Sequence, residues 1–202
     1  MTEQKSGASQ HPVPRALLFD FYGVLFPARF AAWVNEHAKD QRQRDHFFEM
    51  ANASDRGEQP KREFYAELGR LSGTSLGSVE YALHHNQQPL PGMLELLRSL
   101  AEPYTVGILS NSDARIVRDL LDAFDVSRLL SAVVLSTEVG MIKPEPGIFQ
   151  LALTQLGTAA AECVFIDDTV SHVAAAERYG LRGVVFTTKE ALEQELHTLL
   201  KF

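Results

Sequence analysis

The sequence predicts an α/β fold in which helices cover a parallel β-sheet and a helical insertion follows the first strand. Two observations predict it. From residue 89 onward, short apolar runs alternate with amphipathic stretches, the pattern of strands joined by helical crossovers. Between the first apolar run and this region, residues 27–88 are rich in charged residues and carry apolar residues at helical spacing. The 202 residues are enough for one such domain with a modest insertion.

The first strand is expected at the start of the stretch ALLFDFYGVLF, residues 16–26. Its apolar run is typical of a strand buried on both faces. Asp20 follows at the carboxyl end of this strand, and Gly23 marks a turn. Residues 1–14 are polar and contain two prolines close together, so we expect a loose tail before the strand.

Residues 27–88 are expected to form a helical cap. Apolar residues such as Phe64 and Leu68 recur there at helical spacing. Trp33 and the Phe47–Phe48 pair either face a substrate or pack in the core of the cap, and packing is the favoured interpretation.

The second half of the chain is expected to complete the sheet. Pro89, Pro91 and Gly92 mark the return from the insertion. Four further strands are predicted at residues 105–109, 132–136, 163–167 and 183–186. Helices are predicted at residues 93–100, 110–124, 170–179 and 189–200, and another carries Phe149, Leu153 and Leu156. Residues 15–26 and 89–202 would then form a Rossmann-like core with both faces of the sheet covered.

Composition and charge exclude several classes of function. The formal net charge of -7 argues against a surface for nucleic acid or anionic membrane, because such a surface is basic. No apolar run approaches the roughly 18 residues of a membrane span, and the first residues lack the apolar stretch of a secretory signal. We therefore expect a cytoplasmic protein. Its one cysteine, Cys163, lies in an apolar run, which predicts a buried, inert thiol.

Polar residues stand at the carboxyl ends of three expected strands, and a lysine lies in the loop after a fourth. They are Asp20, Ser110 with Asn111, Lys143, and Asp167 with Asp168. Because parallel strands place their carboxyl ends at one edge of the sheet, these residues are expected to converge. Neighbouring carboxylates repel one another unless a cation lies between them, and oxygen ligands of this kind favour Mg²⁺.

The four motifs DFYGVL, ILSNS, GMIKPEPGIF and FIDDT, in this order, resemble those of the haloacid dehalogenase-like (HAD) hydrolase superfamily. The resemblance extends from Ala16 to about Phe186, and the helical insertion resembles the small cap of many members. It implies an HAD-like core and a hydrolase. It also implies that Asp20 is a nucleophile that forms a covalent intermediate, and that Lys143 neutralises charge.

The resemblance implies roles for the other residues as well. Ser110 and Asn111 would hydrogen-bond the transferred group, Ser110 as part of the catalytic set. Asp168, helped by Asp167, would hold Mg²⁺ together with Asp20 and the main-chain carbonyl of Tyr22. The expected activity is that of an Mg²⁺-dependent phosphatase that acts on a small phosphomonoester through an aspartyl-phosphate, with no nucleic-acid or membrane partner. The sequence leaves the substrate and the oligomeric state open.

Tyr22 departs from the phosphatase pattern. Phosphatases of this superfamily usually carry a second Asp at this position, which protonates the leaving group and later activates water. A phenol, with an ordinary pKa near 10, is a poor general base at neutral pH. Tyrosine here resembles the 2-haloacid dehalogenases, which need no Mg²⁺, generally lack the DD pair and take the halide with a cap arginine. The cap offers Arg29, Arg42, Arg44, Arg56, Arg62 and Arg70.

Three functions therefore remain open: the phosphatase, a metal-independent C-halogen hydrolase that uses the same Asp20, and a protein that binds Mg²⁺ and phosphate but turns over poorly. Two further pairs are ambiguous. His84 and His85 either face the cleft or lie in a solvated loop, and Glu138 or Glu145 either orients Lys143 or is solvated.

Overall fold

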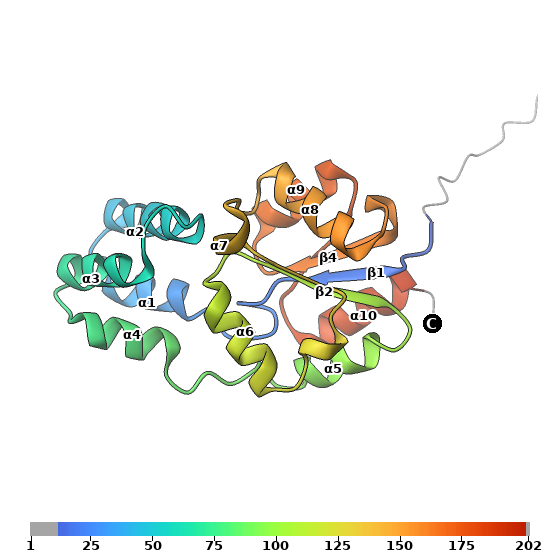
Figure 1. Cartoon of the computed structure of the whole chain (residues 1–202), viewed down its shortest axis with the longest axis horizontal. Helices are drawn as coiled ribbons and strands as arrows, with labels where there is room; N and C mark the ends of the chain where they lie inside the picture. The colour runs from blue at the N-terminus through green and yellow to red at the C-terminus, as the bar shows by residue number, and fades with distance from the viewer. Residues whose placement is uncertain (1–11, 201–202) are drawn as a thin grey trace, which may run out of the picture.

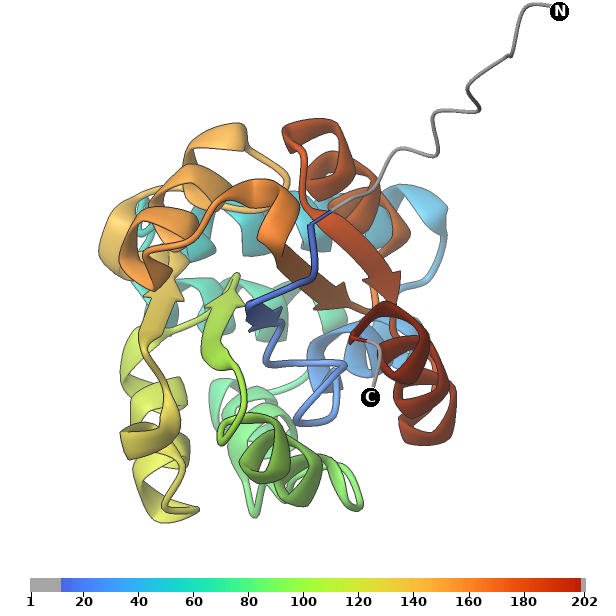
Figure 2. The ribbon, with the colours of Figure 1, turned by 90° about the vertical axis from the view of Figure 1, so that its right-hand side faces the viewer.

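A five-stranded parallel sheet forms the centre of the molecule. The computed structural model describes residues 12–200, so most of the tail expected at residues 1–14 lies outside the described part. The strand order is β3-β2-β1-β4-β5, which Figure 2 shows with helices above and below. The strands are β1 (Ala16–Phe19), β2 (Thr105–Ser110), β3 (Ala132–Leu135), β4 (Cys163–Asp167) and β5 (Arg182–Val185).

Strand β1 lies at the middle of the sheet and pairs in parallel with β2 and β4. Leu18 is opposite Gly107 on one side and Phe165 on the other. Its four residues have no exposed surface, as the apolar sequence predicted. The carboxyl ends of β1, β2 and β4 therefore meet at one edge, where Asp20, Ser110 and Asp167 follow or end the strands.

Helices cover both faces of the sheet and confirm the predicted α/β class. On one face, α5 (Met93–Leu100), α6 (Ala114–Ala123) and α10 (Lys189–Leu200) pack against Leu17 and Phe19. On the other face, α8 (Pro146–Leu156) and α9 (Val170–Tyr179) pack against Ala16 and Leu18. Each fully buried leucine or phenylalanine contributes about 1.5–3 kcal/mol to folding. Successive side chains of β1 therefore point to opposite faces of the sheet and pack into two separate hydrophobic cores.

The region after β3 differs from the sequence prediction. Ser136 was expected to end the strand and a loop to follow, but Ser136–Val139 form the short helix α7. Ser136 is fully buried, and its hydroxyl accepts a hydrogen bond from Ser112 N at 2.9 Å. Gly140, with φ +66°, ends the helix in the left-handed conformation that glycine adopts without steric cost. Short 3₁₀ turns also form at Ser127–Leu129 and Ala160–Glu162.

Four helices of the insertion form a bundle at one end of the molecule, to the left in Figure 1. They are α1 (Arg29–His37), α2 (Gln41–Asp55), α3 (Lys61–Ser72) and α4 (Leu76–His84), and we call them the cap. The cap has its own apolar core, in which Trp33 and Phe47 are buried as the favoured interpretation predicted. None of the helices at residues 12–200 is long and apolar enough to cross a membrane.

The cap leaves and rejoins the core at neighbouring points. Arg29, at the start of α1, donates from Nη1 to His85 O at 2.6 Å and from Nη2 to Asn86 O at 3.2 Å. Next to this contact, where the chain returns to the core, Leu90 N donates to Leu25 O at 2.8 Å. A second connection joins Arg56, after α2, to Glu145, before α8, through an ion pair. The side chain of Arg29 thus fastens the two ends of the insertion together.

Candidate active site

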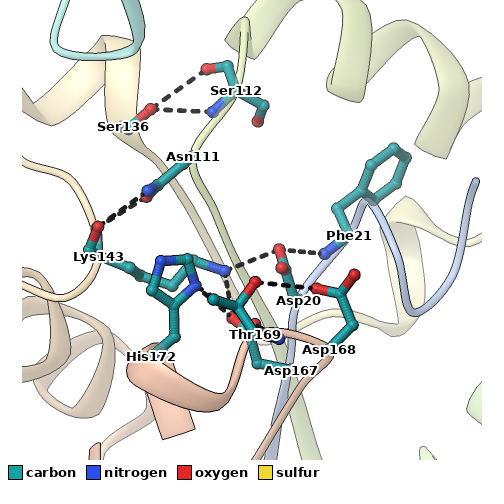
Figure 3. A network of polar contacts seen from close by, with 10 residues as sticks. All are labelled: Asp20, Phe21, Asn111, Ser112, Ser136, Lys143, Asp167, Asp168, Thr169 and His172. Carbon is teal, nitrogen blue, oxygen red and sulfur yellow. Dashed lines mark hydrogen bonds and ion pairs between the residues drawn. The ribbon is translucent and has the colours of Figure 1, made fainter. Parts of the chain in front are cut away.

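Asp20, Lys143 and Asp167 meet at the carboxyl edge of the sheet (Figure 3). Lys143 Nζ lies 2.8 Å from Asp20 Oδ1 and 2.6 Å from Asp167 Oδ2. The side chains of Lys143 and Asp167 are 1% and 0% exposed, and that of Asp20 is 9% exposed. Phe21 N also donates to Asp20 Oδ1 at 2.7 Å. Residues more than 120 positions apart thus form one buried charged group, as the strand order requires.

Asn111 holds the lysine loop in place. Its side-chain Nδ2 donates to Lys143 O at 3.0 Å, and its Oδ1 accepts from Lys143 N at 2.8 Å. Both ends of the amide therefore bind the main chain of Lys143. Asn111 also lines the cavity, so its predicted contact with the transferred group stays a prediction, and its side-chain amide positions the lysine loop. Ser110, buried at the end of β2, lies on the wall of the same cavity.

Neither glutamate near Lys143 in the sequence pairs with its ammonium. Glu138 forms a bidentate ion pair with Arg118, with both distances 2.8 Å, and Glu145 pairs with Arg56. Both glutamates thus have arginine partners, so the hypothesis that one of them orients the ammonium is wrong. Asp20 and Asp167 orient it instead.

Asp167 has its oxygens occupied by N–H donors. Besides Lys143, Thr169 N donates to Oδ1 at 2.7 Å, and His172 Nδ1 lies 3.2 Å from Oδ2. Burial opposes ionisation of Asp167, but Lys143 and His172 outweigh it, so the pKa of this carboxyl is lowered. Asp20, Asp167 and His172 also place possible ligand atoms within 4.8 Å of one another, yet the ammonium of Lys143 already bridges the two carboxylates.

Lys143 shares its single positive charge between Asp20 and Asp167, so the charge of ionised Asp20 is only partly compensated. Burial raises the pKa of Asp20 to about 8; Lys143 lowers it, and the neighbouring Asp167 raises it. Burial also opposes the charged form of Lys143, but the two carboxylates overcome this and raise its pKa. One ammonium thus serves two carboxylates. A second cation beside Asp20 would favour its ionised form.

Asp168 lies against the loop that follows Asp20. A Cβ placed on Gly23, which has φ +92°, would come within 2.1 Å of Asp168 Oδ2. Only glycine therefore fits between the loop and this carboxylate. Burial, followed by the charge of Asp167, raises the pKa of Asp168. Oxygen donors at one buried edge fit a hard divalent cation such as Mg²⁺, with Asp20, Asp168 and the main-chain carbonyl of Tyr22 as the candidate ligands.

Tyr22 is half-buried on the wall of the cavity, next to the acidic group. Its ring packs edge-on against Phe21, with centroids 5.0 Å apart. Burial raises the pKa of Tyr22 to about 12, beyond the ordinary value for a phenol. At neutral pH the Tyr22 hydroxyl is therefore even less often ionised than a free phenol, so it is still less available as a general base.

A cavity of about 240 Å³ lies between the catalytic edge and the cap. Its floor carries Asp20, Ser110, Asn111, Lys143 and Asp168, whereas Asp167 is fully buried and is not among the residues that line the cavity. The cap forms its roof. The roof residues are Ala28, Arg29, Phe30, Ala31, Ala51, Asp55, Lys61, Phe64, Tyr65, Leu83 and His84.

The two histidines at the end of the cap face different surroundings. His84 lines the cavity, with Nε2 2.7 Å from the hydroxyl of Tyr65, and burial lowers its pKa. His85 is exposed and stacks on Tyr81, with centroids 4.2 Å apart. Among the six cap arginines considered above, Arg29 is the one that lines this cavity.

Sequence reasoning missed several residues of the chamber. His172 follows Asp167 by five positions and sits in the first turn of α9, a spacing that could have indicated a contact with the strand end. Asp55 and Lys61 flank the turn between α2 and α3 and pair with each other at 2.5 Å. No local signal in the sequence shows that this pair faces the catalytic edge.

The fold and this site define a hydrolase with a buried carboxylate beneath a helical cap, and comparison with known proteins assigns the family. A family model described as haloacid dehalogenase-like hydrolase matches residues 14–180. The chain belongs to this family, which confirms the resemblance found in the sequence.

Two curated relatives and one solved structure show the range of the family. The chain is 27% identical over 195 residues to the sesquiterpene phosphatase astK of Aspergillus oryzae, covering 92% of this chain and 96% of that protein. It is 26% identical over 190 residues to (S)-2-haloacid dehalogenase 1 of a Pseudomonas species, with 84% and 83% covered. A HAD family enzyme from Bacteroides thetaiotaomicron, crystallised with magnesium and inorganic phosphate, has a TM-score of 0.68 at 23% identity, with 89% and 98% covered.

Proposed function

We propose that this hydrolase is an Mg²⁺-dependent phosphatase that acts on a small phosphomonoester through an aspartyl-phosphate at Asp20. The observation that carries the proposal is the meeting of Asp20, Lys143 and Asp168 at one edge of the sheet, which combines a buried nucleophile, a buried positive charge and an exposed carboxylate that can serve as an oxygen ligand. The phosphatase relative and the magnesium- and phosphate-bound structural neighbour support the same assignment.

Asp20 attacks phosphorus in the first step. A bond forms between its carboxylate oxygen and phosphorus, the bond to the alcohol oxygen breaks, and that oxygen leaves with the electron pair and takes a proton from solvent. Lys143, 2.8 Å from Asp20, reduces the repulsion between this carboxylate and the anionic phosphate. Ser110 is placed on the wall of the cavity to donate a hydrogen bond to the phosphoryl oxygens.

Water releases the phosphate in the second step. It attacks phosphorus, the bond to Asp20 breaks, and the carboxylate and inorganic phosphate are restored while the proton of the water passes to solvent. Splitting the hydrolysis in this way replaces one difficult displacement by two easier ones. Asp167 keeps Lys143 aligned in both steps through the 2.6 Å contact.

Asp20, Asp168 and the Tyr22 carbonyl would hold the Mg²⁺, and Asp167 supports the site through its neighbours. When bound, Mg²⁺ supplies the additional positive charge that favours ionised Asp20 and attracts the phosphate. The raised pKa of Asp20 is the observation that supports a need for this charge.

Phosphate release from a panel that includes acetyl phosphate and alkyl phosphates tests the proposal. We expect activity with Mg²⁺, loss of activity with EDTA, recovery when Mg²⁺ is restored, and loss in Asp20→Asn. A matched control is Asp119→Asn on the outer side of α6, which should keep full activity. Activity that persists in EDTA or in Asp20→Asn would contradict the mechanism.

A C-halogen hydrolase is the second candidate, and Tyr22 together with the haloacid dehalogenase relative favours it. Asp20 would then displace halide from carbon, and the leaving halide would need no proton. Arg29 is the cap arginine that lines the cavity, and it would have to leave its bonds to the carbonyls of His85 and Asn86 to bind such an anion. Halide release from a 2-haloacid in the presence of EDTA would support this function. Binding of Mg²⁺ and phosphate with neither activity would support a binding protein with poor turnover.

A further inference from the structure

The polar side chains of the roof already have partners within the cap. Asp55 and Lys61 pair at 2.5 Å, and His84 Nε2 lies 2.7 Å from the Tyr65 hydroxyl. Arg29 donates to the main-chain carbonyls of His85 and Asn86. These polar groups of the roof are thus engaged before a substrate arrives.

The rest of the roof is apolar, whereas the core side of the cavity also carries polar residues such as Ser112 and Asp113. Phe30, Phe64 and Leu83 reach the cavity from three different cap helices, and Ile116 reaches it from α6 of the core. Ala31 and Ala51 complete this lining without polar atoms in their side chains. A hydroxyl-rich organic group would lose bonds to water against these side chains, and the roof groups that are already paired could replace only part of them.

The size of the chamber limits the organic group as well. Its volume of about 240 Å³ lies below the roughly 300–1,000 Å³ of sites that hold drug-sized ligands. The floor must also accommodate the phosphate beside Asp20 and Lys143. The space under the roof therefore suits a compact group.

From the paired roof groups and the apolar lining, we infer that the substrate is the monophosphate of a small, largely apolar alcohol. This inference rests on the proposed function, because the phosphatase reaction defines which end of the ligand meets the floor. The phosphate lies at the catalytic edge, and the hydrocarbon part lies against Phe30, Phe64 and Leu83. Sugar and nucleoside phosphates are then poor substrates.

A matched pair of esters tests the inference. Hexyl phosphate and glucose phosphate both present six carbons, but only glucose carries hydroxyls into the roof. An apolar site discriminates by about 100-fold against one added hydroxyl, so we expect kcat/KM to favour hexyl phosphate by at least about 100-fold. Equal values, or a preference for glucose phosphate, would overturn the inference.

Two neighbouring alanines of α1 supply a variant and its control. Ala31 lines the cavity, whereas Ala32 is exposed. Ala31→Asp should reduce the preference for hexyl phosphate by about 10-fold or more, because it places a carboxylate in the roof. The melting temperature of Ala31→Asp should stay close to that of the wild type, which shows that the variant is folded. Ala32→Asp should change neither. An unchanged preference in Ala31→Asp would contradict the assignment of the roof.

Binding measurements with phosphonates distinguish a failure of this inference from a failure of the proposed phosphatase function. If wild-type protein hydrolyses neither acetyl phosphate nor any ester, the phosphatase proposal fails. Calorimetry with hexylphosphonate and methylphosphonate, which cannot be hydrolysed, then tests the roof directly. Binding of hexylphosphonate at least about 10-fold tighter than methylphosphonate supports the inference, since each buried methylene contributes about 0.8 kcal/mol. Equal affinities, or no binding of hexylphosphonate, would overturn it.

Discussion

Replacement of Tyr22 by aspartate should increase the hydrolysis of alkyl phosphates. Tyr22 lies on the wall of the chamber, where a leaving alcohol oxygen needs a proton. Burial raises its pKa to about 12, so the hydroxyl stays protonated at neutral pH and cannot accept a proton. It is an equally reluctant proton donor. A carboxyl group at this position supplies a general acid and, after the first step, a general base.

The size of the gain depends on the leaving group. A well-placed general acid contributes about 10²- to 10⁴-fold, so kcat for hexyl phosphate should rise by a factor in this range. Acetyl phosphate has a leaving group that departs without a proton, and its rate should hardly change. The loss of the half-buried ring that packs against Phe21 should cost about 1–2 kcal/mol of stability, which leaves the protein folded.

Release of inorganic phosphate, measured in parallel for both substrates with Mg²⁺, provides the assay. Tyr22→Asn is the matched control, because asparagine has the size of aspartate but cannot transfer a proton in the same way. If Tyr22→Asn accelerates hexyl phosphate as much as Tyr22→Asp, the gain comes from space and not from acid catalysis. No gain in Tyr22→Asp would refute the reasoning about Tyr22.

Three further predictions concern the same core. Lys143→Met leaves Asp20 and Asp167 facing each other without their ammonium, so the free energy of unfolding, measured by urea titration, should fall by about 3–5 kcal/mol; an unchanged midpoint would contradict the central role of this ion group. Gly23→Ala should cost about 1–3 kcal/mol through its positive φ and weaken Mg²⁺ binding in calorimetry by displacing Asp168, and native affinity would refute that contact. Burial raises the pKa of Cys163 to about 12, so its thiol should react with a disulfide reagent only in denaturant, and stability should fall as pH rises from about 8.5 towards 12. Cys163→Ala should lose less stability over this range, and rapid labelling of the native protein would contradict the burial of the thiol.

The sequence predicted the sheet and the residues that meet at its carboxyl edge well because both depend on local patterns. An apolar run that ends in Asp20 defines a buried strand and the position of its acid at once. The parallel topology then brings Lys143 and Asp167 to the same edge without any knowledge of their contacts. The length of β3 was less certain, since Ser136 was assigned to the strand and instead begins a helix.

The roof of the chamber could not be predicted in the same way. Whether Asp55 and Lys61 face the substrate or solvent depends on how α2 and α3 rotate when they pack, and the charged sequence permits either. Asn111 illustrates the same limit at the catalytic edge. Its position after β2 was predictable, but its bonds to the main chain of Lys143 depend on a loop 32 residues away.

The hydrogen bonds of Arg29 to the carbonyls of His85 and Asn86 hold the two ends of the cap together, which allows one cap to be exchanged for another with a different substrate preference. Since the insertion begins and ends at one place, the core need not stretch or reorganise to accommodate a cap of different length, and the entropic cost of closing a longer loop rises only slowly. The four cap helices can therefore be transplanted as a cassette between relatives with this junction. Such a chimera should keep the hydrolytic chemistry of its core and take the substrate preference of the cap donor.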